Sequence, residues 1–155
     1  YFDMLSEPCS VVIGFAAPRE KEGVYRRLKR NPLISFPNVV HPRASVSDCA
    51  SLGEGVVIAI DCVVSIDAKM GDCVFLNCGA MVGHDSAVGS FSSIMPSVAV
   101  SGNVEIGDRC MLGVGSLILQ GVKIGSDALV GMGSVVLRDI DSGTSVFGNP
   151  ARRMP

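Results

Sequence analysis

An aliphatic residue or methionine stands at every sixth position of the chain from residue 40 to residue 136. The positions are Val40, Val46, Leu52, Ile58, Val64, Met70, Leu76, Val82, Val88, Ile94, Val100, Ile106, Leu112, Ile118, Ile124, Val130 and Val136. Four residues after each lies a small or slim residue, from Ala44 to Ser134, and only Ile140 in that series is bulky. Neither the helical period of about 3.6 residues nor the strand period of about 2 produces this spacing. A fixed six-residue period is typical of a parallel β-helix, in which each unit is a short strand and a turn.

Three such units make one triangular coil of 18 residues, and a second repeat in the sequence supports that length. Glycine recurs every 18 residues, each time after the aliphatic position of the third face: Gly53, Gly71, Gly89, Gly107 and Gly125. A glycine repeated at one corner indicates either a backbone φ above zero or close packing. We therefore predict coils stacked about 4.8 Å apart, with an inward aliphatic column on each of three faces. The period does not fix the hand of the coil, and most parallel crossovers are right-handed.

Residues outside the repeat predict two smaller parts. Residues 10–14 predict a short buried strand that ends in glycine, and residues 18–30 predict a polar helix, acidic early and basic late. Residues 1–39 are therefore the tail of an α/β unit with its linker. The basic run at the helix end is either an anion-binding patch or a solvated face that suits the helix dipole. Residues 40–141 form the solenoid, and residues 142–155 are predicted to fold over its last coil as a cap.

Composition narrows the functional classes. The chain has 48% hydrophobic and 18% charged residues, which fits a strand-rich solenoid, and its net charge of −2 gives no electrostatic reason to expect nucleic acid or an anionic membrane as partner. No apolar run approaches the ~20 residues of a membrane span. The six cysteines include no CxxC pair, so we expect reduced thiols and a cytoplasmic protein. Because the first residue is tyrosine, we expect a fragment of a longer protein.

The candidate chemistry centres on His84, which lies two residues after the inward Val82 and therefore at an outward corner. Asp85 follows it, and a histidine beside an acid can act as a general base; the alternative is an ordinary exposed histidine. Gly102 comes 18 residues after His84, so we expect it one coil above. Its N–H could face a developing oxyanion, which suits acyl transfer, or Gly102 is simply a corner residue.

An outward apolar column is the second candidate feature. Pro96, Val114 and Met132 are 18 residues apart and should lie above one another on the surface. An exposed apolar ladder on a solenoid indicates a partner. That partner is either another subunit or a long thin ligand laid parallel to the solenoid axis.

These residues resemble those of hexapeptide-repeat acyltransferases, and more closely the sialic acid O-acetyltransferases and the bacillosamine-type UDP-4-amino-sugar N-acetyltransferases. The similarity is carried by residues 83–89, 100–107 and 146–152. It implies an all-β, left-handed parallel β-helix and a homotrimer that binds acetyl-CoA in clefts between subunits. It also implies an N-terminal Rossmann-like domain for a sugar or nucleotide sugar, and a role such as cell-surface polysaccharide biosynthesis.

The resemblance implies residue roles as well. His84 would be the general base, Asp85 its acidic neighbour, and Gly102 the donor to the thioester carbonyl. The implied contacts to acetyl-CoA are Ser93, Gly102, Val114 and Met132, and the implied contact to the sugar nucleotide is Gly14. We therefore expect direct acetyl transfer to an amine or hydroxyl of a sugar, with no metal and no covalent enzyme intermediate.

Two other functions fit the same coil. One is a non-catalytic trimeric scaffold. The other is a zinc-dependent carbonic anhydrase, whose metal needs three histidines; this chain has only His41 and His84, far apart in coil number, which makes that function a poor fit.

Overall fold

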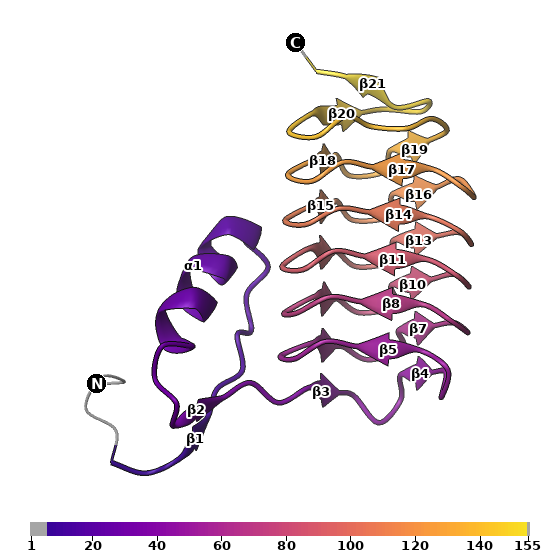
Figure 1. The fold of residues 1–155 in the computed structure, drawn as a ribbon. Coiled ribbons are helices and arrows are strands. Elements are labelled where there is room, and N and C mark those ends of the chain that lie inside the picture. The colour runs from indigo at the N-terminus through magenta and orange to yellow at the C-terminus, as the bar shows by residue number, and fades with distance from the viewer. Residues whose placement is uncertain (1–5, 155) are drawn as a thin grey trace.

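A triangular solenoid of stacked coils makes up most of the computed structural model, which describes residues 6–154 (Figure 1). Its eight-stranded sheet contains β3 (Val39–Val40), β6 (Val57–Ile58), β9 (Phe75–Leu76), β12 (Ser93–Ile94), β15 (Met111–Leu112), β18 (Leu129–Val130), β20 (Ser145–Phe147) and β21 (Arg152–Arg153). Its six-stranded sheet contains β4 (Ser45–Val46), β7 (Val63–Val64), β10 (Met81–Val82), β13 (Ala99–Val100), β16 (Leu117–Ile118) and β19 (Val135–Val136). Its five-stranded sheet contains β5 (Ser51–Leu52), β8 (Lys69–Met70), β11 (Ala87–Val88), β14 (Glu105–Ile106) and β17 (Lys123–Ile124).

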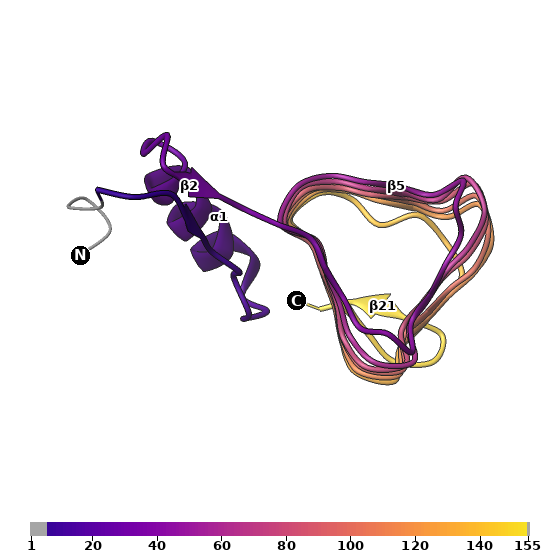
Figure 2. The same ribbon diagram turned by 90° about the horizontal axis from the view of Figure 1, so that it is seen from below.

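The strand register confirms the predicted coil length. From β3 to β19, each strand pairs in parallel with the strand 18 residues away, as Val82 does with Val64 below and Val100 above. The aliphatic columns point inward, and most of their members are at most 4% exposed. In the view along the axis from the N-terminal end, the chain runs counterclockwise as it recedes (Figure 2). The coil is therefore left-handed, as the family resemblance implied.

The turns show why the coil can repeat every six residues. Every sixth residue from Gly55 to Gly133 has a positive φ, between 52° and 77°. Such a residue completes a tight turn between two strands. The 18-residue glycine column is different, because none of its members has a positive φ. A Cβ on Gly107 would lie 2.5 Å from the backbone nitrogen of Ser126 in the next coil, so close packing is the reason for that column.

A small α/β unit lies beside the solenoid (Figures 1 and 2). It consists of β1 (Cys9–Ser10) and β2 (Ile34–Ser35), paired in parallel, and α1 (Pro18–Leu28) between them. The helix begins with a proline and carries Glu20 in its first turn and basic residues in its last, as predicted. Strand β1 is shorter than the strand predicted at residues 10–14. Its pairing with β2 continues at Val11, whose N–H donates to the Ser35 carbonyl at 2.9 Å.

The helix packs on the corner between the five-stranded and eight-stranded sheets, which we call the helix corner. Tyr25 lies between Phe36 and Phe91, with ring centroids 4.8 and 5.3 Å away. The start of α1 contacts a late coil, where Arg19 pairs with Asp127 at 3.2 Å, and its end contacts an early coil, where Lys29 pairs with Glu54. One helical turn rises about 5.4 Å and one coil about 4.8 Å, so successive turns of α1 meet successive coils.

Strands β20 and β21 lie over the last coil. Strand β20 continues the eight-stranded sheet above β18, and β21 turns back to pair with β20 in antiparallel fashion. No helix among residues 6–154 is long and apolar enough to cross a membrane.

Candidate active site

His84 lies in the turn between β10 and β11, where the six-stranded and five-stranded sheets meet. We call this the histidine corner. The imidazole is half exposed, and its Nδ1 is 2.8 Å from Oδ2 of Asp85, the positive-φ residue of the same turn. This contact positions Nδ1–H as the donor and leaves Nε2 as the free basic nitrogen.

Gly102 lies directly above His84, as the count of 18 predicted. The backbone carbonyl of His84 accepts the N–H of Asn103 at 2.8 Å, which fixes one coil on the other. The imidazole occupies the space that a side chain at Gly102 would fill: a Cβ there would lie 2.6 Å from Cε1 and would also overlap Nε2. Gly102 is therefore a glycine because the histidine ring packs against it.

The N–H of Gly102 has no hydrogen-bond acceptor among residues 6–154. A buried residue with an unpaired backbone donor is uncommon in folded proteins, and at a functional site it often awaits a ligand. A basic imidazole nitrogen and a free N–H thus lie next to each other at one corner. Together they can remove a proton from a nucleophile and stabilise an oxyanion.

Two residues that the sequence reasoning overlooked support this corner. Ser86 is 1% exposed; its hydroxyl donates to the Ser101 carbonyl at 2.9 Å and accepts the Val104 N–H at 3.0 Å. Gly83 allows the two coils to approach, since its Cβ would lie 2.6 Å from the Gly102 nitrogen. The available signal for Ser86 was a hydroxyl in an inward slot that holds alanine at residues 50 and 68.

Val114 and Met132 lie at the third corner, between the eight-stranded and six-stranded sheets, which we call the methionine corner. Val114 is 41% and Met132 66% exposed, whereas Pro96 below them is half-buried. Within one chain they are separated from His84 by the width of the six-stranded sheet. Gly14 lies elsewhere again, exposed in the loop between β1 and α1, where a Cβ would meet nothing within 4 Å.

Ser93 has a different environment from the one expected of a contact to acetyl-CoA. It is 0% exposed in the eight-stranded sheet, beneath the α/β unit. Its hydroxyl donates to the Ala16 carbonyl at 2.6 Å and accepts a hydrogen bond from Nζ of Lys21 at 2.9 Å. These partners leave no surface for a ligand, so we leave Ser93 out of the acetyl-CoA site. Among residues 6–154, no group of three or more histidine, cysteine, aspartate or glutamate side chains could hold a metal ion.

Comparison with known proteins agrees with this geometry. The family described as the hexapeptide repeat of succinyl-transferase matches residues 103–138. The structure of PerB from Caulobacter crescentus, in complex with CoA and GDP-perosamine, is 34% identical over 94% of this chain and 70% of that one, with a TM-score of 0.92. The chain belongs to the hexapeptide-repeat sugar acetyltransferases. It is thus an enzyme that transfers acyl groups.

Two further solved structures match this chain with similar TM-scores. The acetyltransferase domain of PglB from Neisseria gonorrhoeae, in complex with acetyl coenzyme A, is 31% identical over 94% of this chain and 70% of that one, with a TM-score of 0.90. WeeI from Acinetobacter baumannii is 28% identical over 99% of this chain and 76% of that one, with a TM-score of 0.93. GDP-perosamine N-acetyltransferase has also been crystallised as variants in which one histidine is replaced by alanine or asparagine.

Proposed function

We propose that this sugar acetyltransferase moves the acetyl group of acetyl-CoA to the amine of a nucleotide-linked amino sugar, with His84 as general base. The observation that carries the proposal is the joint placement of His84, Asp85 and Gly102 at one corner. The similar proteins crystallised with CoA and GDP-perosamine support the choice of an amine over a hydroxyl and of CoA as acyl carrier.

The acetyl group passes directly from CoA to the sugar, without a covalent enzyme intermediate. Nε2 of His84 takes a proton from the sugar amine as the nitrogen attacks the thioester carbonyl, and Asp85 stabilises the imidazolium through Nδ1–H. The carbonyl oxygen gains negative charge and accepts the N–H of Gly102. When the tetrahedral intermediate collapses, the carbon–sulfur bond breaks and the CoA thiolate leaves, to be protonated by the imidazolium or by water.

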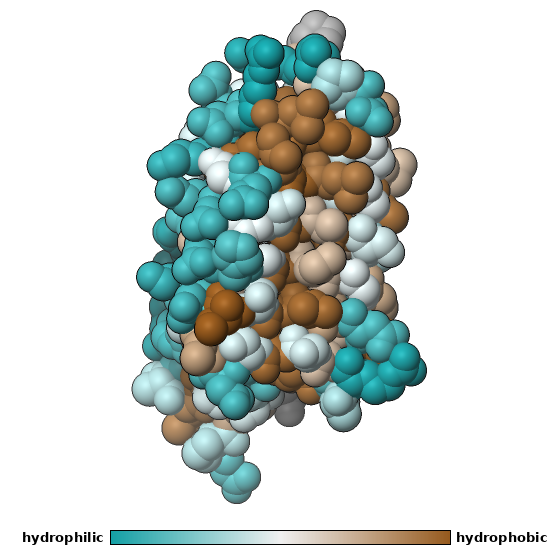
Figure 3. Space-filling model, turned by 90° about the vertical axis from the view of Figure 1, so that its right-hand side faces the viewer, coloured by the Kyte–Doolittle hydropathy of each residue, from teal (hydrophilic) through white to brown (hydrophobic). Residues whose placement is uncertain are grey.

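The exposed face of the six-stranded sheet supports a trimer. Apolar side chains gather there and form a band along the axis (Figure 3), among them Val63, Met81, Leu117, Leu119 and Leu137, each between 39% and 50% exposed. An apolar face of this kind needs a partner. In a closed threefold ring with these sheets inward, the histidine corner of one subunit meets the methionine corner of the next.

This arrangement joins the two separated parts of the site. Acetyl-CoA would lie in the cleft between two subunits, with its thioester at His84 and Gly102 of one and its pantetheine arm along Val114 and Met132 of the other. The sugar would be held by the α/β unit, where Gly14 opens the loop to solvent.

The enzymatic proposal is tested by incubating the protein with acetyl-CoA and a panel of nucleotide-linked amino sugars, with sialic acids as the hydroxyl-bearing comparison. We expect thiol release and an acetylated amine with at least one amino sugar. Turnover with sialic acids only would replace the amine by a hydroxyl, and no turnover with any acceptor, together with no acetyl-CoA binding in calorimetry, would indicate the scaffold.

The shared cleft is tested by mixing subunits. His84→Asn and Met132→Arg should each inactivate the trimer alone. In co-expressed mixed trimers, about a quarter of the clefts combine an intact His84 with an intact Met132 of the neighbour, so activity should return. A site formed within one chain would recover none.

A further inference from the structure

Lys21 is a buried lysine at the junction of the α/β unit and the solenoid. It is 1% exposed, although it belongs to a helix whose other basic residues all lie at the surface. Its Nζ donates to the Ser92 carbonyl at 3.2 Å and to the Ser93 hydroxyl at 2.9 Å. Ser93 in turn donates to the Ala16 carbonyl at 2.6 Å. One chain of hydrogen bonds therefore links α1, the loop before it and β12.

This ammonium group has no acidic partner: no ion pair within residues 6–154 includes Lys21. Burial lowers the pKa of Lys21 to about 8. The titratable group that faces it is the thiol of Cys73, whose own pKa burial raises to about 11, and the Phe75 ring lies 6.0 Å away. At neutral pH the lysine is thus an unpaired buried cation, a feature that costs stability.

The two ends of this link carry different parts of the proposed site. Ala16 lies two residues after Gly14, in the loop that would contact the sugar nucleotide. Ser93 lies nine residues after His84, in the same coil of 18 residues. Other polar contacts also hold α1 to the solenoid, namely the pair of Glu22 with Arg109 at 3.6 Å, the hydrogen bond of Tyr25 to Glu54, and the more exposed pairs of Arg19 and Lys29. These contacts come from the helix and its C-terminal end, and they do not involve the Gly14–Ala17 loop, which is held by the Ser93 hydroxyl.

We propose that Lys21 and Ser93 are positioning residues that fix the Gly14–Ala17 loop on the coil that carries His84. This inference rests on the proposed function. Transfer requires the sugar amine to reach the thioester carbonyl, and a displacement of about 1 Å can reduce the rate about 100-fold. The link sets the height of the sugar-binding loop along the solenoid axis and so the distance that the amine must span.

The test compares Lys21→Met and Ser93→Ala with Ser93→Thr, which keeps the hydroxyl. We expect kcat/KM for the amino-sugar substrate to fall about 10- to 100-fold in the first two variants, with the KM for acetyl-CoA unchanged. Ser93→Thr keeps the hydroxyl but adds a methyl group at a fully buried position, so it should recover most of the loss seen in Ser93→Ala. Adding Ser93→Ala to Lys21→Met should change little further, because the two side chains act as one link. Arg27→Met, exposed on the same helix, is the matched control and should behave as wild type.

Thermal unfolding separates positioning from simple stabilisation. Lys21→Met should not lower Tm at pH 7, because it removes an unpaired buried charge. The folded-state pKa lies below the unfolded value, so the cost of the charge is greatest below pH 8 and falls as pH rises toward the unfolded value. Any stability advantage of Lys21→Met should shrink over that window.

Two results would overturn the inference: wild-type kinetics in Lys21→Met, or a lower Tm with all kinetic constants reduced together. If the wild-type protein transfers no acetyl group to any acceptor, the proposed function itself fails. An active wild type with an unaffected Lys21→Met removes only the positioning role.

Discussion

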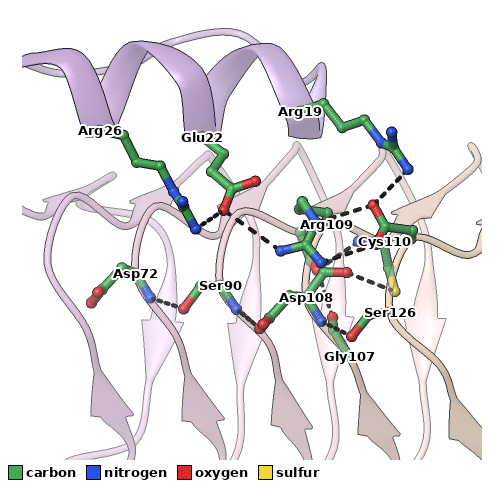
Figure 4. A network of polar contacts seen from close by, with 12 residues as sticks. Arg19, Glu22, Arg26, Asp72, Ser90, Gly107, Asp108, Arg109, Cys110 and Ser126 are labelled. Atoms are coloured by element: carbon green, nitrogen blue, oxygen red, sulfur yellow. Dashed lines mark hydrogen bonds and ion pairs between the residues drawn. The ribbon is translucent and has the colours of Figure 1, made fainter. Parts of the chain in front are cut away.

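The helix corner and the histidine corner have the same turn backbone, and they differ in the side chains that accept hydrogen bonds from the turn N–H groups. At the helix corner, four successive turn N–H groups are each bonded by a side chain from the next coil, and Figure 4 shows the upper three of these bonds. Glu54 N–H donates to Asp72 Oδ1 at 3.0 Å, and the same pattern repeats upward through Ser90, Asp108 and Ser126, at 2.8 to 3.1 Å. The glycine column makes room for these side chains.

The histidine corner has the same turns and lacks this ladder. Its successive outward residues are Asp48, Ile66, His84, Gly102, Gln120 and Arg138. Gly102 has no side chain to cap the turn below, and its own N–H is unpaired among residues 6–154. A solenoid corner therefore has a structural role where side chains of one coil accept the turn N–H groups of its neighbour. It becomes available for chemistry where a turn N–H is left without an acceptor.

Replacing the base should give the largest effect at the histidine corner. In His84→Asn we expect kcat to fall about 10²- to 10⁴-fold, the contribution typical of a general base. Steady-state kinetics with saturating acetyl-CoA would measure it. His41→Asn, the other histidine of the chain, should keep its activity. Near wild-type turnover in His84→Asn would remove the chemical distinction between the two corners.

Filling the space above the ring should have the next largest effect. In Gly102→Ala the new Cβ would push against Cε1 of His84, so we expect activity to fall about 10- to 100-fold through misplacement of the base. Gly102 does not have a positive φ, so Tm should change little. Gly23→Ala is the control, because its Cβ would meet nothing within 4 Å. Alanine favours the helix over glycine, so the free energy of unfolding should rise by up to about 1 kcal/mol. Equal activity in both variants would contradict the packing argument.

The six-residue period predicted the part of this site that depends on counting. Because every coil has 18 residues, the period places Gly102 over His84 and Val114 under Met132 with no knowledge of the rest of the fold. The period could not predict that Ser93 is buried, because the helix that covers it lies more than 60 residues earlier in the chain. The burial of Lys21 is unpredictable for the same reason, because the sequence indicates only that its helix is polar. Contacts between the repeat and a non-repeating unit leave no periodic trace.

Removing the charge next to the imidazole should have a smaller effect. Asp85→Asn keeps an oxygen that can accept Nδ1–H and loses the negative charge that stabilises the imidazolium, so we expect kcat to fall about tenfold. Asp67→Asn is a close control, because Asp67 occupies the same turn position one coil below and also has a positive φ. The two variants should differ in kcat and agree in Tm. Similar kcat values would show that Asp85 serves the turn and not the base.

Removing a cap should have the smallest effect and compares the corners most directly. Asp108→Ala leaves the Ser90 N–H without its 2.8 Å acceptor, and we expect a loss of about 1 kcal/mol in unfolding free energy with unchanged kinetics. Asp108→Ser should recover most of it, since serine caps the turn at Ser90 and Ser126. Gln120→Ala, at the equivalent position above Gly102, caps nothing and should stay within about 0.5 kcal/mol. Equal losses for Asp108→Ala and Gln120→Ala in denaturant titrations would mean that the histidine corner is capped as well, and its free N–H could then not be assigned to the oxyanion.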